Sequence, residues 1–136
     1  MPNRIYITQC SASKDPYYRD SGLPTTPDRL YTSSHLQAFV HRCTTHDVPW
    51  AIHSDRYGVW FPREEHVWYE KDPSKVSPDE FKVLLARFDD KLQPFREIWF
   101  YHQNPAHIHH LYRNLFQVSQ LKARIRLFSH IREICP

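Results

Sequence analysis

The feature that most constrains the fold is the alternation of short apolar runs with segments of helical periodicity. The apolar runs are rich in β-branched and aromatic residues, and the segments between them repeat apolar residues every three or four positions. Such alternation is typical of mainly parallel sheets with right-handed crossovers. We therefore expect an α/β fold, a single three-layer domain over residues 1–136 with a central sheet of about four strands and helices on its faces. The expected strands are residues 4–9, 50–53, 95–101 and 121–128, and the expected helices are residues 34–47, 77–88 and 105–118.

Two long segments without regular periodicity follow the first two expected strands. Residues 10–29 contain three prolines and Gly22, a density of breakers that excludes regular structure over most of the segment, and residues 54–76 also look irregular. Long loops in small domains are commonly functional, and ligands of parallel sheets bind outside the carboxyl ends of the strands. We expect the two loops to meet at one site.

The chain has only two glycines, Gly22 and Gly58, which excludes the glycine-rich loops that bind dinucleotides and nucleoside triphosphates. An anion site must then come from another loop. The best candidate follows the first strand and consists of Cys10, Ser11, Ser13 and Lys14. Its small polar residues leave backbone amides open to phosphate or carboxylate, although a plain polar turn explains the hydroxyls equally well. Cys10 is either a nucleophile activated by Lys14 or a small buried residue.

A second group of polar and aromatic side chains follows the strand at residues 50–53. Its members are Ser54, Asp55, Arg56, Tyr57 and Gly58. Asp55 beside Arg56 could orient or polarise a substrate, Tyr57 could stack on a base, and Gly58 suits a turn with positive φ. The alternative is a surface turn whose Asp–Arg pair contributes less than about 1 kcal/mol.

Aromatic residues and charges crowd the segment that comes next. Trp60, Phe61, Trp68 and Tyr69 lie among several Arg, Lys and Glu residues. Aromatic rings with interspersed cations form stacking platforms for bases, but rings under an irregular loop also complete a core. Glu65 and Glu70 are possible general bases.

The histidines and cysteines give no metal signature. His107 and His110 share a helix face, but no acidic or thiol partner stands at ligand spacing, so we expect no metal and no cofactor. Three widely separated cysteines fit a reducing compartment better than a disulfide framework. With no apolar run of membrane length and no leader-like segment, we expect a cytoplasmic protein without a membrane partner.

Charge is uneven along the chain. Residues 1–91 hold 12 basic and 13 acidic side chains, whereas residues 92–136 hold 6 basic and 2 acidic ones. The basic residues that could contact phosphates are Arg113, Lys122, Arg124, Arg126 and Arg132. The basic residues of the last expected strand are explained equally well as cations that prevent an exposed sheet edge from pairing with other chains.

Three groups of residues, in fixed order and spacing, carry a resemblance to a known family. They are Cys10-Ser11-x-x-Lys14, Leu30-Tyr31-x-Ser33, and Ser54-x-x-Tyr57-Gly58 with Pro62 and Tyr69-Glu70. Over roughly residues 4–90 the chain resembles a family of small prokaryotic and phage domains. That family is similar to the α/β domains of the uracil-DNA-glycosylase group and of archaeosine-type tRNA-modification enzymes. The chain departs from the family pattern at Arg29, where the family has Asp, at Arg56, where it has Lys, and at Trp68-Tyr69-Glu70, where it has Pro-Tyr-Asp.

The resemblance implies a pocket for a nucleobase or nucleotide at the strand ends. In that pocket Cys10, Ser11 and Lys14 would form the anion loop, Tyr31 and Ser33 its neighbouring wall, and Ser54, Tyr57, Gly58 and Tyr69 the opposite wall. Fold-level similarity alone does not define the reaction.

Together these observations predict an enzyme that acts on a nucleobase, nucleotide or nucleic acid, by N-glycosidic bond cleavage or base exchange. Lys14 and the serines would hold phosphate, Tyr57 or Tyr69 would stack on the base, and Asp55 or Glu70 would orient water or stabilise an oxocarbenium-like state. Two alternatives stay open. One is a noncatalytic nucleic-acid-binding module that uses the basic C-terminal part, and the other is a nucleotide-sensing accessory domain.

Overall fold

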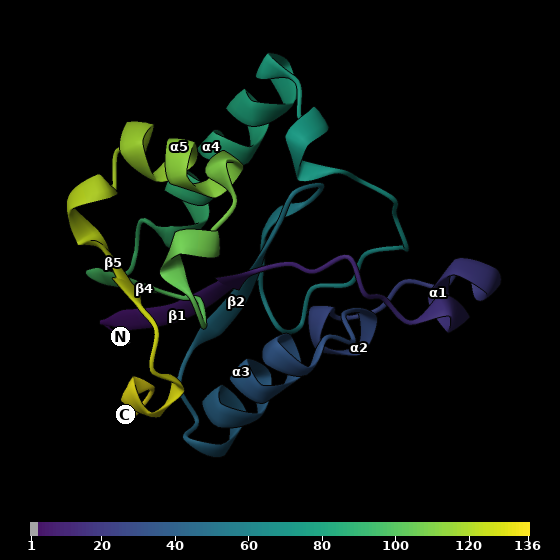
Figure 1. Ribbon diagram of the computed structural model, residues 1–136, viewed down its shortest axis with the longest axis horizontal. Helices are drawn as coiled ribbons and strands as arrows, with labels where there is room; N and C mark the ends of the chain where they lie inside the picture. The colour runs from purple at the N-terminus through teal and green to yellow at the C-terminus, as the bar shows by residue number, and fades with distance from the viewer. Residues whose placement is uncertain (1–2) are drawn as a thin grey trace.

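A five-stranded sheet lies at the centre of the computed structural model, which describes residues 3–136 (Figure 1). The strands are β1 (Arg4–Gln9), β2 (Trp50–Ser54), β3 (Gly58–Trp60), β4 (Glu97–Tyr101) and β5 (Ile125–Phe128). Their order across the sheet is β3-β2-β1-β4-β5. All neighbouring pairs are parallel except β2 and β3, which are antiparallel. The fold is thus α/β with a mostly parallel sheet, as the sequence predicts.

The helices are α1 (Pro16–Ser21), α2 (Pro27–Leu30), α3 (Ser34–Thr45), α4 (Pro78–Leu92) and α5 (His110–Val118). α3, α4 and α5 pack on the faces of the sheet, whereas α1 lies away from it and has no buried residue (Figure 1). Side chains of α4 and α5 form one apolar cluster with Ile5 and Ile7 of β1, whereas α3 forms a second cluster with Tyr6. Because alternate residues of a strand point to opposite faces, the two clusters lie on opposite sides of the sheet. Figure 1 shows α4 and α5 on one side of the sheet and α3 on the other.

Local signals in the sequence account for where the long helices begin. The Ser77 hydroxyl accepts a hydrogen bond from the Glu80 backbone N–H, and the Glu80 carboxylate accepts one from the Ser77 N–H, which completes a capping box. Ser33 caps α3 in the same manner by accepting from the Leu36 N–H. Each cap satisfies backbone donors that the first helical turn leaves open.

The sheet has five strands rather than about four because β3 lies in a segment that the sequence presents as irregular. Gly58 adopts a φ of 76°, a left-handed conformation that lets the chain reverse after β2 and pair with it again. All three residues of β3 are buried, and Gly58 packs against the Arg87 and Leu84 side chains of α4. A three-residue strand is too short to show periodicity, so the expectation of a loop there is wrong.

Gly58→Ala is expected to lower the free energy of unfolding by about 1–2 kcal/mol, because a residue with a Cβ is strained at positive φ. The added Cβ would also lie 3.3 Å from the Cδ atom of Arg87. Gly22→Ala is the matched control, since Gly22 has a φ of 69° but nothing within 4 Å of an added Cβ. Urea unfolding should rank Gly58→Ala as the more destabilising variant, and the reverse ranking would contradict this packing.

Three further expectations need correction. Residues 10–29 contain the short helices α1 and α2, whose N-terminal positions are occupied by prolines. The helix expected from Pro105 begins only at His110, after a 3₁₀ turn at Pro105–His107, and Val118 at its end is exposed rather than buried. The strand expected from residue 121 begins at Ile125, because Lys122–Arg124 form another 3₁₀ turn.

The helices found within residues 3–136 are all too short or too polar to cross a bilayer.

Candidate functional site

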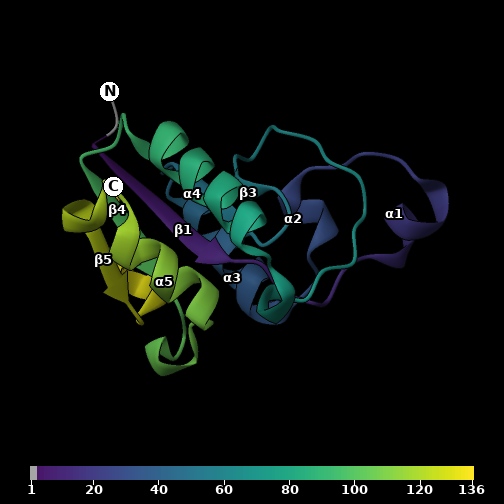
Figure 2. The ribbon, with the colours of Figure 1, turned by 90° about the horizontal axis from the view of Figure 1, so that it is seen from above.

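The loop after β1 contacts both the turn after β2 and the long loop after β3, the two parts of the second irregular segment. Thr25 of the first loop pairs with His66 of the second through two backbone hydrogen bonds, of 2.9 and 3.0 Å. Closer to the sheet, the Cys10 thiol lies 3.6 Å from the Asp55 carboxylate oxygen Oδ1. Figure 2 shows the same neighbourhood from above, with the first loop and the long loop after β3 extending side by side toward α1. The edge of the sheet expected to hold a site therefore holds both loops.

A cavity of about 200 Å³ opens where the loops meet. It is lined by Gln9, Cys10, Ser11, Ala12, Lys14, Asp55, Lys71, Pro73, His107, His109 and Tyr112. We call it the charged cavity, because Lys14, Lys71 and Asp55 are among these residues. The Lys71 ammonium is ion-paired with the Glu80 carboxylate, whereas Lys14 forms no ion pair within residues 3–136, so an anionic ligand would meet Lys14 as the unpaired ammonium group.

Asp55 is the buried acid of the charged cavity. Only 4% of the residue is exposed, and burial raises the pKa of its carboxyl above the ordinary value. Hydrogen bonds from Tyr69 and Cys10 and the charge of Lys14 act in the opposite direction on the same pKa. A carboxyl whose pKa is raised by burial beside a cavity suits general acid–base work.

Cys10 lies next to Asp55 as a neutral thiol. Burial, followed by the nearby Asp55 charge, raises the pKa of Cys10 to about 11, so the thiolate is scarce at pH 7. The sulfur also lies 3.3 Å from the Tyr112 hydroxyl. For Cys10 to be an activated nucleophile, Lys14 would have to lower the pKa of the thiol, and Lys14 is not among the causes of the shift. Cys10 therefore acts as a hydrogen-bond donor to Asp55.

Three hydroxyl groups form a buried cluster behind the charged cavity. Tyr31 and Tyr69 share a hydrogen bond between their hydroxyls, and the Ser54 hydroxyl lies 3.2 Å from that of Tyr69. Burial raises the pKa of Tyr31 and of Tyr69, so both remain protonated at neutral pH. The Lys14 ammonium sits 4.5 Å from the centre of the Tyr69 ring. This cluster fixes the position of Lys14 and supplies the neutral donor that faces Asp55.

The loop after β1 retains free backbone donors. Within the described part of the chain, the N–H groups of residues 11–14 donate to no protein acceptor. Ser11 and Lys14 line the charged cavity, whereas Ser13 is exposed and its carbonyl accepts from the Ser11 hydroxyl and the Thr32 N–H. Successive free amides beside a lysine are an arrangement that binds anions.

Several expected site residues lie outside the cavity. Tyr57 stacks on His66 at 4.0 Å between ring centres and donates its hydroxyl to the Val67 carbonyl. Its ring is thus already engaged. Arg56 and Glu70 are exposed, and neither lines the charged cavity. The Ser54 hydroxyl accepts from the Arg56 and Tyr57 N–H groups, so this serine shapes the turn that presents Asp55.

The residues of the aromatic segment that begins at Trp60 are likewise divided between the core and the surface. Trp60 and Tyr69 are buried in the core, while Trp68 is half-buried with Lys14 and Arg19 near its ring at 5.6 and 5.7 Å. Glu65 is exposed. The rings of this segment therefore mainly complete the core under the loop.

The structure adds site residues from the C-terminal half of the chain. Tyr112 comes from α5, Lys71 and Pro73 from the long second loop, and His107 and His109 from the loop after β4. The signal for the histidines was the run of His residues directly after a predicted strand. These histidines reach the charged cavity because β4 lies beside β1 in the sheet.

The basic residues of the C-terminal part do not form one open patch. Arg113 donates to the Ile108 and Pro105 carbonyls, and Arg124 donates to the Gln93 and Phe95 carbonyls. Arg126 is exposed and covers the Trp99 ring at 4.3 Å. Lys122 and Arg132 are also exposed, although the Arg132 carbonyl accepts from Arg42. Two of the candidate phosphate contacts are thus used to hold the fold together.

Within residues 3–136, no three His, Cys, Asp or Glu side chains gather in a metal-ligating arrangement. His109 instead caps α5, because its Nδ1 atom accepts from the Leu111 N–H. Comparison of the chain with protein-family models, with curated proteins and with solved structures found no match.

Proposed function

We propose that the protein is an enzyme that hydrolyses an N-glycosidic bond in a nucleotide or nucleic acid. The observation that carries this proposal is the charged cavity, which a buried carboxyl of raised pKa, Asp55, lines together with Lys14 and with Lys71, the partner of Glu80. The cations suit a phosphate, and the carboxyl suits the anomeric carbon of the sugar attached to it. The resemblance of residues 4–90 to nucleobase-handling α/β domains agrees with this substrate class.

In the proposed reaction Asp55 takes a proton from a water molecule whose oxygen bonds to the anomeric carbon. The bond between that carbon and the base nitrogen breaks, and its electron pair leaves with the base, which then takes up a proton. The Asp55 charge also stabilises the oxocarbenium character that develops on the sugar. Cys10 keeps the carboxylate in place by donating a hydrogen bond to it, and Tyr69 favours its charged form. Base exchange follows the same path with a second base in place of water.

The direct test is release of free base by the purified protein. Ribonucleoside and deoxyribonucleoside 5′-monophosphates and single-stranded RNA and DNA serve as substrates, and chromatography measures the free base. We expect release from at least one of these substrates. Absence of release from all of them, together with absence of exchange when a free base is added, would sink the proposal.

Lys14→Gln is expected to raise KM by about tenfold with a smaller change in kcat, because the ammonium binds phosphate in the ground state and the transition state alike. Glutamine keeps an unbranched polar side chain but lacks the ammonium that lies 4.5 Å from the centre of the Tyr69 ring. The matched control is Lys75→Gln, an exposed lysine on the 3₁₀ turn at Pro73–Lys75. Equal KM values for both variants would show that Lys14 does not hold the substrate.

A further inference from the structure

A second cavity adjoins the charged cavity, at the point where the strand order reverses between β1 and β4. Its volume is about 270 Å³, and it shares Gln9, Cys10, Ser11 and His107 with the charged cavity. Pockets for small ligands usually span about 300–1,000 Å³, a range that neither cavity reaches alone. Ligands of open α/β sheets bind at such reversal points. The two cavities therefore form one composite site.

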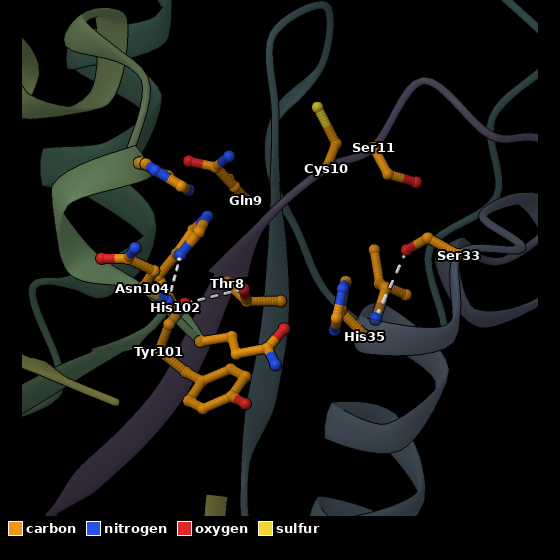
Figure 3. A pocket seen from close by; sticks show the side chains of 12 residues that line it. Thr8, Gln9, Cys10, Ser11, Ser33, His35, Tyr101, His102 and Asn104 are labelled. Carbon is orange, nitrogen blue, oxygen red and sulfur yellow. Dashed lines mark hydrogen bonds between the residues drawn. The ribbon is translucent and has the colours of Figure 1, made fainter. Parts of the chain in front are cut away.

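The second cavity is uncharged, in contrast to the first. Among the described residues that line it there is no Asp, Glu, Lys or Arg. Its lining combines amides and imidazoles with Tyr101, Leu36 and small hydroxyl residues. Figure 3 shows Gln9, His102 and Asn104 on one side and Ser33 and His35 on the other, with Thr8 between them. We call it the neutral cavity.

Three side chains of the neutral cavity have their acceptor atoms occupied by backbone N–H groups. The Gln9 oxygen Oε1 accepts from the His109 N–H at 3.3 Å, and the Asn104 oxygen Oδ1 accepts from the Ala106 N–H at 3.1 Å. His102 Nδ1 accepts from the Asn104 N–H at 2.9 Å. Because a backbone N–H can only donate, these bonds determine the orientation of both amides and the tautomer of the neutral imidazole.

Among Gln9, His102, Asn104 and Ser33, the groups that remain free are donors. The Thr8 hydroxyl already donates to the Tyr101 carbonyl, and no hydrogen bond within residues 3–136 fixes the role of the Gln103, His35 or His107 side chain. Gln9 and Asn104 keep their NH₂ groups, and His102 in its neutral form keeps the Nε2 proton. The pKa of His102 is lowered by burial and by the neighbouring His107, which maintains that neutral form. The Ser33 hydroxyl accepts from the Leu36 N–H and likewise keeps its proton available. The neutral cavity thus presents hydrogen-bond donors without formal charge.

We infer that the neutral cavity is the base-recognition subsite and that it selects nucleobases that present a ring carbonyl over those that present an amino group. This inference rests on the proposed function in taking a nucleotide as ligand. The charged cavity would hold the sugar phosphate, and the shared Gln9 would stand between the two parts. An amino group on the base would bring donor against donor, and the bound base would leave the donors that it covers without partners.

Matched nucleotide pairs test this selection directly. Uridine and cytidine monophosphates differ at ring position 4, inosine and adenosine monophosphates differ at ring position 6, and in both pairs a carbonyl replaces an amino group. Isothermal titration of the wild-type protein should show at least tenfold tighter binding of the carbonyl member of one pair. Equal affinities within both pairs would overturn the inference.

Two isosteric variants locate the effect. In Gln9→Glu and Asn104→Asp a carboxylate oxygen still accepts the backbone N–H that holds the side chain, while the free donor becomes an acceptor. Each variant should weaken binding of the preferred nucleotide at least tenfold, which corresponds to about 1.4 kcal/mol. Asn104→Asp should leave ribose 5-phosphate binding within about threefold, because Asn104 does not line the charged cavity, whereas the carboxylate of Gln9→Glu would also repel the phosphate. Gln117→Glu, exposed on α5, makes the same charge change away from both cavities and should behave as the wild type.

The outcomes separate this inference from the proposed function. If nucleotides and ribose 5-phosphate bind but both variants behave as the wild type, the neutral cavity is not the base subsite, whereas the proposed function stands. If neither the nucleotides nor ribose 5-phosphate bind, the inference fails, and the proposed function fails with it if no base is released from RNA or DNA either.

Discussion

Replacing Asp55 by asparagine is expected to reduce base release at least about 100-fold, the usual loss when a positioned acid or base is removed. The amide has the shape of the carboxyl and can still accept from the Cys10 thiol, 3.6 Å from Oδ1. It can neither take a proton from water nor stabilise positive charge on the sugar. The effect should therefore fall on kcat, with substrate binding largely retained. Steady-state kinetics of base release measure both quantities.

Two carboxyl variants sharpen this result. Asp90→Asn, exposed on α4, makes the same chemical change away from the site and should retain wild-type activity. Glu70→Gln decides between the two acids suggested by the sequence, because the structure leaves Glu70 exposed and outside the charged cavity. A large loss in Glu70→Gln with full activity in Asp55→Asn would reassign the reaction to the surface near α1.

The parts of the fold that the sequence predicts are those determined by local signals. Ser77 and Glu80 predict the start of α4, and the strand predicted over residues 4–9 has the same bounds as β1. The sequence does not predict α1, although Asp15 caps its start and Gly22 its end, because the prolines around it favour a loop. His109 caps α5 through its ring nitrogen, an unusual capping residue that a sequence rule for Ser, Thr, Asp and Asn does not detect.

The candidate site could be predicted only where it depends on neighbouring strand ends. Cys10, Lys14 and Asp55 follow β1 and β2, which are adjacent strands, and the structure brings all three to the charged cavity. Tyr112 and Lys71 reach the same cavity through packing of α5 and through the path of a long loop, which no local pattern encodes. The strand order β2-β1-β4 is what adds the neutral cavity.

His53 is expected to make the protein lose about 2 kcal/mol of stability between pH 7 and pH 5. The residue is fully buried in β2, and burial lowers its pKa from 6.5 to about 3. In the folded state the imidazole stays neutral down to about pH 3, whereas in the unfolded chain it takes up a proton below about pH 6.5. Unfolding therefore binds a proton between these values, and the free energy of unfolding falls as the pH falls.

His53→Leu should remove this pH dependence and should not destabilise the protein at pH 7. Neither ring nitrogen of His53 has a hydrogen-bond partner among residues 3–136, so the substitution removes two buried polar atoms that cost free energy. The leucine loses the ring contacts with Tyr112 and Phe88, at 4.9 and 5.5 Å, but keeps an apolar side chain among them.

Urea unfolding at pH 7 and pH 5 measures both effects. The wild type and His41→Gln, in which an exposed imidazole of α3 is replaced, should both become less stable at pH 5, by about 2 kcal/mol more than His53→Leu. An equal pH dependence in all three proteins would show that His53 gains a proton while buried, and hence that β2 carries a charged group beside the Cys10–Asp55 pair.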